Sequence, residues 1–142
     1  MRKILIGSIV MTAILCLGGV RAVIADQAAV EQATKAADAW LKLVDAGDYA
    51  ASYKQTSSLF QEQVSEAKWI QKAGAARKPL GPLVSRRIKA AQYETTLPGA
   101  PDGQYVVILY DTSFAHKKSA IETVVPMLDK DGKWHVSGYY IR

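Results

Sequence analysis

The sequence predicts an α+β domain in which N-terminal helices pack on a curved four-stranded antiparallel sheet. Between residues 30 and 77, apolar residues recur at three- and four-residue spacing, which is typical of amphipathic helices. From residue 83 onward, the pattern changes to β-branched and aromatic runs separated by turn residues, which is typical of strands. The connections between these runs are short, so we expect consecutive strands to pair antiparallel.

The helical half is predicted to hold one long helix followed by three short ones. Gly47 follows the long helix at the position where a left-handed C-cap is expected. Asp48 can cap a second helix, and the hydroxyl residues at 56–58 can cap a third. Ser65 can cap a fourth, which ends near Arg77. The apolar stripe of the long helix consists of Val30, Ala33, Ala37, Trp40, Leu41 and Val44.

The second half is predicted to form a meander of four strands. Residues 106–110 are apolar on both strand faces, so the strand that contains them should lie centrally in the sheet. The Asp131–Gly132 pair favours a tight hairpin before the last strand. Helices that cover one face of such a sheet can enclose a cone-shaped pocket beneath the long helix. The strands are expected at residues 83–95, 105–115, 119–128 and 134–141.

The N-terminus has the pattern of a secretory signal peptide. Arg2 and Lys3 form a positively charged start, and the 17 residues 4–20 are apolar apart from Gly, Ser and Thr. Val23-Ile24-Ala25 then places small or apolar residues at the positions that a signal peptidase reads.

We therefore expect residues 1–25 to be a signal peptide, with cleavage after Ala25 and with Ala22 as the second choice. Residues 26–142 would then be a single α+β domain, exported to the periplasm. The alternative is an N-terminal membrane anchor that is not cleaved, because 17 apolar residues are near the lower limit for spanning a bilayer.

Composition narrows the chemistry of the mature domain. The whole chain has a formal charge of +5, but without residues 1–25 it holds 15 basic and 13 acidic residues, a net charge of +2. This charge is small, and export also argues against a nucleic-acid partner. Cys16 is the only cysteine and lies in the leader, so the mature domain has no thiol nucleophile and no disulfide. The sequence contains no phosphate-binding glycine loop and no His–Glu metal motif, and we predict neither a cofactor nor a metal.

Arg86 is the most informative polar residue. On the strand 83–95 it has the same parity as Val84, Ile88 and Ala90. If that set faces the core, Arg86 points inward, because side chains alternate between the two faces of a strand. A single β-bulge would reverse this parity.

An inward Arg86 needs a carboxylate partner, because an unpaired buried charge is strongly unfavourable. Either Glu122 or Asp111 can supply it from a neighbouring strand. One interpretation is a pocket in which Arg86 binds an anionic ligand, and the other is a structural ion pair.

Two aromatic residues complete the candidate pocket. Trp40 is most simply a core anchor, and the alternative is a side chain that lines a site for a small apolar ligand. Tyr105 begins a strand and can offer a hydroxyl donor, although strand tyrosines are commonly half-buried packing residues. The candidate binding residues are therefore Arg86, Asp111, Glu122, Trp40 and Tyr105, and no catalytic residue is assigned.

Several segments of the mature chain are characteristic as a set: residues 39–49 (AWLKLVDAGDY), Trp69, 77–81 (RKPLG), 85–87 (SRR), 97–99 (LPG), 102–105 (DGQY) and 134–140 (WHVSGYY). Together they resemble an exported bacterial family known as domain of unknown function 4019. That family has no assigned reaction, so the resemblance implies no catalytic positions. Its layout is similar to the cystatin-like, nuclear-transport-factor-2-like superfold, which hosts both enzymes and binding proteins, so fold alone implies no function.

Three hypotheses of function follow. The leading one is a non-catalytic periplasmic binding module for a small apolar or anionic ligand or for an envelope protein; a helix–sheet interior filled by side chains would count against the ligand version. The second is a cofactor-independent pocket enzyme that transfers protons, which needs an unpaired acid in an apolar cavity. The third is a structural homodimer whose sheets pack back to back.

Overall fold

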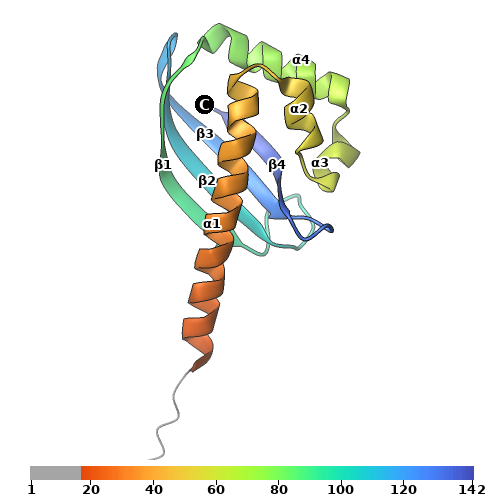
Figure 1. Ribbon diagram of the computed structural model, residues 1–142, viewed down its shortest axis with the longest axis vertical. Helices are drawn as coiled ribbons and strands as arrows, with labels where there is room; N and C mark the ends of the chain where they lie inside the picture. The colour runs from red at the N-terminus through yellow and green to blue at the C-terminus, as the bar shows by residue number, and fades with distance from the viewer. Residues whose placement is uncertain (1–16) are drawn as a thin grey trace, which may run out of the picture.

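The computed structural model describes residues 17–142, in which four α-helices precede a four-stranded sheet (Figure 1). The sheet is open, and the predicted α+β class is confirmed. The helices are α1 (Leu17–Asp45), α2 (Tyr49–Lys54), α3 (Ser58–Gln63) and α4 (Glu66–Arg77), followed by a 3-10 turn at Lys78–Leu80. The strands are β1 (Leu83–Glu94), β2 (Tyr105–Phe114), β3 (Lys117–Leu128) and β4 (Trp134–Ile141).

Helix α1 lies along one face of the sheet and contacts all four strands (Figure 1). Its predicted apolar stripe is the buried one, with Ala33, Trp40 and Val44 almost fully inaccessible to solvent. The helix ends at Asp45, and Gly47 takes a φ of +74°, a left-handed conformation that side chains with a Cβ rarely adopt. The chain can therefore reverse tightly into α2.

The N-terminal turns of α1 extend beyond the sheet (Figure 1). Val23 and Ile24 are 65% and 61% exposed there, just before the expected cleavage site at Ala25. Residues 1–16, which carry most of the expected signal peptide, lie outside the described residues. Over residues 17–142, no helix is long and apolar enough to cross a membrane. Export and cleavage therefore stay predictions.

The three short helices begin at the predicted caps. The Asp48 side chain accepts the backbone N–H of Ala51, and the Ser57 side chain accepts that of Phe60, each at 3.1 Å. The Ser65 side chain accepts from Lys68 at 3.3 Å in the same way. Each cap pairs an amide that the first helical turn would otherwise leave without a partner.

The strands are arranged in the order β1-β2-β3-β4, and every neighbouring pair is antiparallel. As predicted, β2 is a central strand. Its inward residues, among them Val106, Ile108 and Tyr110, are buried against the helices, whereas Val107 and Leu109 alternate with them on the outer face. Strand β3 begins at Lys117, two residues before the predicted start at residue 119.

The parity prediction for β1 was only partly correct. Arg86 is turned inward, with 11% of its side chain exposed, but Val84 and Ile88 are exposed. A register shift between Ile88 and Ala90 then reverses the alternation, so the next residue that packs on the core is Ala91. The extra residue of a β-bulge exchanges the faces of every position beyond it.

Side chains fill the space between the helices and the sheet, where the sequence predicted a cone-shaped pocket. The rings of Trp40, Trp69 and Tyr139 pack together with centroid separations of 5.2–6.3 Å. The Trp40 indole donates to the Ser52 carbonyl, and the Trp69 indole donates to the Ser52 hydroxyl, both at 2.9 Å. Both indole N–H groups therefore have partners in an apolar interior, as buried polar groups require.

Candidate functional site

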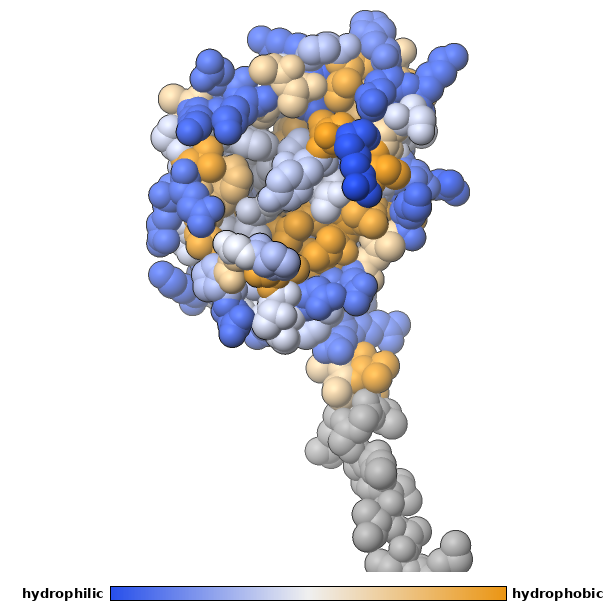
Figure 2. All heavy atoms as spheres, turned by 180° about the vertical axis from the view of Figure 1, so that it is seen from behind, coloured by the Kyte–Doolittle hydropathy of each residue, from blue (hydrophilic) through white to orange (hydrophobic). Residues whose placement is uncertain are grey.

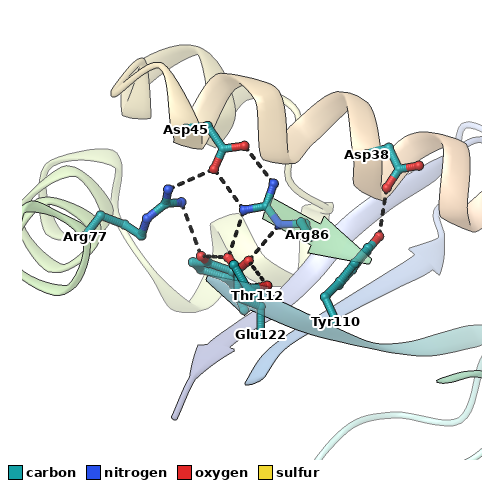
Figure 3. A network of polar contacts seen from close by, with 8 residues as sticks. Asp38, Asp45, Arg77, Arg86, Tyr110, Thr112 and Glu122 are labelled. Carbon is teal, nitrogen blue, oxygen red and sulfur yellow. Dashed lines mark hydrogen bonds and ion pairs between the residues drawn. The ribbon is translucent and has the colours of Figure 1, made fainter. Parts of the chain in front are cut away.

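A cluster of polar side chains lies where α1, α4 and the sheet meet (Figure 3). We call it the polar cluster. All six of its residues come from different elements of the fold, so it joins the helical half of the domain to every strand. Its members are Asp45 from α1, Arg77 from α4, Arg86 from β1, Thr112 from β2, Glu122 from β3 and Tyr139 from β4.

Arg86 bridges the two carboxylates of the polar cluster. Its Nη1 and Nη2 donate to Asp45 at 2.7 and 2.9 Å, while its Nε and Nη2 donate to Glu122 at 2.7 and 3.2 Å. The planar guanidinium therefore makes a two-point contact with each acid (Figure 3). Such two-point contacts fix the orientation of the guanidinium relative to each carboxylate as well as balancing its charge.

Glu122 is the most deeply placed charge, with no exposed surface. Besides Arg86, it accepts a hydrogen bond from Thr112 Oγ1 at 2.7 Å and another from the Tyr139 hydroxyl. Each oxygen of the carboxylate thus has two donors. This number of donors explains how a fully buried carboxylate is tolerated, since every lone pair that lost water gained a partner.

Arg77 closes the polar cluster from the last turn of α4. Its Nη2 donates to Asp45 at 2.8 Å, its Nη1 donates to the Tyr139 hydroxyl at 3.3 Å, and its guanidinium lies 4.8 Å above the Phe114 ring. A cation at a helix C-terminus is favoured by the helix dipole, and stacking on an aromatic face adds to that. Two arginines therefore balance two carboxylates.

The surroundings of the polar cluster shift the pKa values of Asp45, Arg86 and Tyr139 away from neutral pH. Burial by itself raises the pKa of Asp45, but hydrogen bonds from Arg86 and Arg77 outweigh it and hold that pKa below its usual value. Burial lowers the pKa of Arg86, but its bonds to Asp45 and Glu122 raise it further than burial lowers it. Burial and the Glu122 charge both raise the pKa of Tyr139. At neutral pH the Asp45–Arg86 ion pair therefore stays charged, and the Tyr139 hydroxyl keeps its proton.

The structure brings together only two of the five predicted pocket residues, Arg86 and Glu122. Asp111 points to the opposite face of the sheet, where it pairs with Arg87 at 3.1 Å and with Lys89 at 3.5 Å. Glu122 and Asp111 are thus both ion-paired. This argues against the hypothesis of a proton-transfer enzyme, which needs an unpaired acid.

The two aromatic candidates lie elsewhere. Trp40 is a core anchor that is 2% exposed. Tyr105 is buried at the other end of the sheet, where its hydroxyl donates to the Pro101 carbonyl at 2.6 Å. Neither side chain joins Arg86 in a common pocket.

Sequence reasoning missed Asp45 and Arg77, although the sequence holds a signal for both. Asp45 follows Leu41 by four residues and so continues the apolar stripe of α1. Arg77 follows Ala73 by four residues in the same way on the buried face of α4. A charge on an apolar stripe indicates a buried ion pair, because residues four apart lie on one helix face.

An open groove of about 490 Å³ lies beside the polar cluster, between α1 and β1. Two of the acids in it are already engaged: Asp45 by the arginines, and Asp38 by the Tyr110 hydroxyl at 2.9 Å. Its apolar wall includes Ile88, which is 47% exposed. We call it the α1–β1 groove; it is lined by Asp38, Leu41, Lys42, Asp45, Leu83, Arg86, Arg87, Ile88 and Tyr110.

Comparison with known proteins identifies a family but no activity. The sequence profile described as "Protein of unknown function (DUF4019)" matches residues 36–139, so the chain belongs to that family. No curated protein and no solved structure matches the chain. The likeness to the cystatin-like superfold therefore remains a prediction.

Proposed function

We propose that this member of a family without an assigned activity is an exported, non-catalytic domain that binds a partner protein through the α1–β1 groove. The observation that carries the proposal is the groove itself, which is open and partly apolar, whereas the space under α1 is filled. A filled interior disfavours an enclosed small ligand, and it leaves the surface as the place of recognition.

The charges along the groove support binding more than catalysis. Asp45 and Asp38 already accept hydrogen bonds from neighbouring side chains, so neither carboxylate is a free base. Lys42 and Arg87 are exposed at its rim and can meet an anionic partner. Ile88 supplies exposed apolar area next to them, and apolar contacts ringed by polar groups are typical of protein interfaces.

Site-specific photo-crosslinking tests the proposal in cells that export the full chain. A photoreactive residue at position 88 should form an adduct of one recurring mass, whereas the same residue at the exposed control position Lys133 should not. Adducts that are absent at position 88, or identical at the two positions, would contradict binding in the groove.

Native mass spectrometry of the exported protein separates a protein partner from a small ligand. If the groove held a small ligand, the protein would carry an extra mass that an Ile88→Lys variant loses. That result would contradict the partner-protein proposal, and a bare protein mass together with an adduct at position 88 would support it.

The outer face of the sheet favours a second candidate, a homodimer with sheets packed back to back. Seen from behind, this face carries a central apolar area bordered by polar residues (Figure 2). Val107, Leu109 and Ile121 are only partly buried, and no helix within residues 17–142 packs over them. Contiguous apolar area on a soluble domain commonly marks an interface.

The dimer is tested by the molar mass of the exported protein in solution at micromolar concentration. A dimer that a Leu109→Lys substitution converts to a monomer would support it. A monomer at all concentrations would contradict it and would leave the proposal for the α1–β1 groove untouched.

A further inference from the structure

The two edges of the sheet differ in how they are covered. At β4, the Ser57 N–H donates to the Val136 carbonyl at 2.9 Å and Thr56 forms a bridge to the same residue, so the link between α2 and α3 shields that edge. Strand β1 pairs with β2 on one side only, and within residues 17–142 no segment pairs with its other side. The edge of β1 therefore presents unpaired backbone donors and acceptors.

The β1 edge exposes two large apolar side chains. Val84 and Ile88 are 66% and 47% exposed, and Ile88 lines the α1–β1 groove. A strand added at this edge would alternate its side chains between the groove and the outer face of the sheet. Main-chain hydrogen bonds would supply affinity, and the groove would supply selectivity.

The charged side chains of β1 indicate that the partner segment is negatively charged. Arg87 and Lys89 are 81% and 54% exposed and share one carboxylate, Asp111, so the edge keeps an excess of positive charge. Lys42 faces the groove from α1 and makes no ion pair with any residue that the structure describes. Carboxylates on the outer face of an added strand would meet Arg87 and Lys89, whereas a basic segment would be repelled by all three cations.

The same charges argue against a second copy of this chain. An antiparallel pairing of two β1 edges centred on Arg87 would place the two Arg87 side chains directly opposite one another. Like charges in that position destabilise a sheet. Register shifts at Leu83/Ser85 and at Ile88/Ala90 also limit the regular stretch to Ser85–Ile88, and interrupted edges resist indefinite self-pairing.

We propose that the free edge of β1 binds a short, extended, acidic segment of the partner protein as a fifth strand of the sheet. This inference rests on the proposed function and specifies how the partner is held. The segment pairs with Ser85–Ile88, places apolar side chains beside Ile88 in the α1–β1 groove and sets its carboxylates against Arg87 and Lys89 on the outer face.

Three synthetic octapeptides with blocked ends test the proposal on the exported protein. The first alternates Glu with Val, the second replaces every Glu by Lys, and the third is the acidic peptide with N-methyl groups on alternate backbone nitrogens. The readout is amide hydrogen exchange, resolved by residue, together with the dissociation constant.

The acidic peptide should slow exchange within Ser85–Ile88 and leave β4 unchanged. It should bind about tenfold more tightly than the lysine peptide, and the N-methylated peptide should give no protection, because it cannot pair with a strand. Equal binding of the N-methylated and unmodified acidic peptides would overturn strand addition, since only charge would then be recognised. Absence of protection by any peptide would overturn it as well.

Two matched double variants test whether the acidic peptide binds to the positive charges of the β1 edge. The double substitution R87E/K89E should weaken binding of the acidic peptide about tenfold, whereas K130E/K133E, which makes the same charge change on the β3–β4 turn, should alter it by less than about twofold. Equal effects of the two double variants would overturn recognition by the β1 edge.

The two proposals fail separately. An adduct at position 88 in cells, with no protection of β1 by the acidic peptide, would refute strand addition while the partner-binding function stands. Absence of the adduct together with absence of protection would refute both.

Discussion

Glu122 shows at the scale of one residue why the polar cluster is a structural unit. It has no exposed surface, yet four donors from three neighbours converge on its two oxygens. Taking a carboxylate out of water is strongly unfavourable, and only such a complete set of partners offsets it. Removal of one partner should therefore destabilise the fold by more than the intact ion pair stabilises it, because the remaining charge stays buried without a partner.

Replacement of Glu122 by Gln should lower the free energy of unfolding by about 3–5 kcal/mol, because Arg86 would keep only Asp45 as a counter-charge in a buried place. Urea unfolding followed by circular dichroism measures this loss. The control is Asp111→Asn, which removes the surface ion pairs with Arg87 and Lys89 and should change the free energy by about 1 kcal/mol or less. Similar losses in the two variants would contradict a structural role for the polar cluster.

Asp45 makes stability depend on pH in acid. Its pKa lies below the usual 3.8 in the folded protein because Arg86 and Arg77 outweigh the effect of burial. A lowered folded pKa means that the unfolded chain takes up the proton first, so the stabilisation is complete above about pH 4 and is lost as pH falls through the folded pKa.

An Asp45→Asn variant should therefore be less stable at pH 7 and should lose less stability between about pH 5 and pH 2 than the parent. The slope should become shallower but not vanish, because the pKa of Asp129 is lowered as well. Unfolding free energies measured across that range check this. A Ser119→Ala control, which removes no titrating group, should keep the parent slope.

At the scale of elements, caps define where the short helices begin. Helix α4 has twelve residues, and its first turn depends on the Ser65 hydroxyl that accepts the Lys68 amide. The helix carries Trp69 into the core and Arg77 into the polar cluster, so its start sets the position of both. A frayed first turn would loosen them together.

Substitution of Ser65 by Ala should lower the free energy of unfolding by about 1 kcal/mol, as expected for the loss of an N-cap. The midpoint of urea unfolding measures the effect. Ser119→Ala, which changes an exposed strand residue, should alter stability by less than about 0.5 kcal/mol. An unchanged midpoint in Ser65→Ala would show that tertiary packing alone positions α4.

At the scale of the whole molecule, the polar cluster and the ring stack join the two halves of the domain. Helix α1 spans the sheet, and its last residue meets arginines from α4 and β1. The inner face is thus largely covered, while the outer face, the α1–β1 groove and the β1 edge remain exposed. The polar cluster and the ring stack therefore hold the fold together, and the proposed binding surfaces lie outside them.

Export is a prediction for the whole chain and is tested by its mass. The protein recovered from the periplasm should begin at Asp26, because cleavage is expected after Ala25. Intact mass spectrometry gives the result directly. A protein that retains Met1 and stays with the membrane fraction would instead support the uncleaved anchor.

The sequence by itself determined the order and type of the elements. Helix periodicity, the caps at Asp48, within residues 56–58 and at Ser65, and the central apolar run of β2 all depend on interactions within a few residues. The structure confirms each and identifies Ser57 as the cap within 56–58. Strand parity also offered an inward Arg86 on the condition that Val84, Ile88 and Ala90 face the core, and it named Glu122 as one possible partner; the structure has that ion pair although those three residues are exposed.

Only the tertiary structure decided what surrounds Arg86. Asp45 and Arg77 are 32 residues apart in the chain, and their meeting depends on how α1 and α4 dock, which no local spacing encodes. The bulge after Ile88 moved Ala90 away from the core, and rings from separate elements filled the expected pocket. Periodicity tells which face of an element is buried, whereas docking and register decide what that face touches.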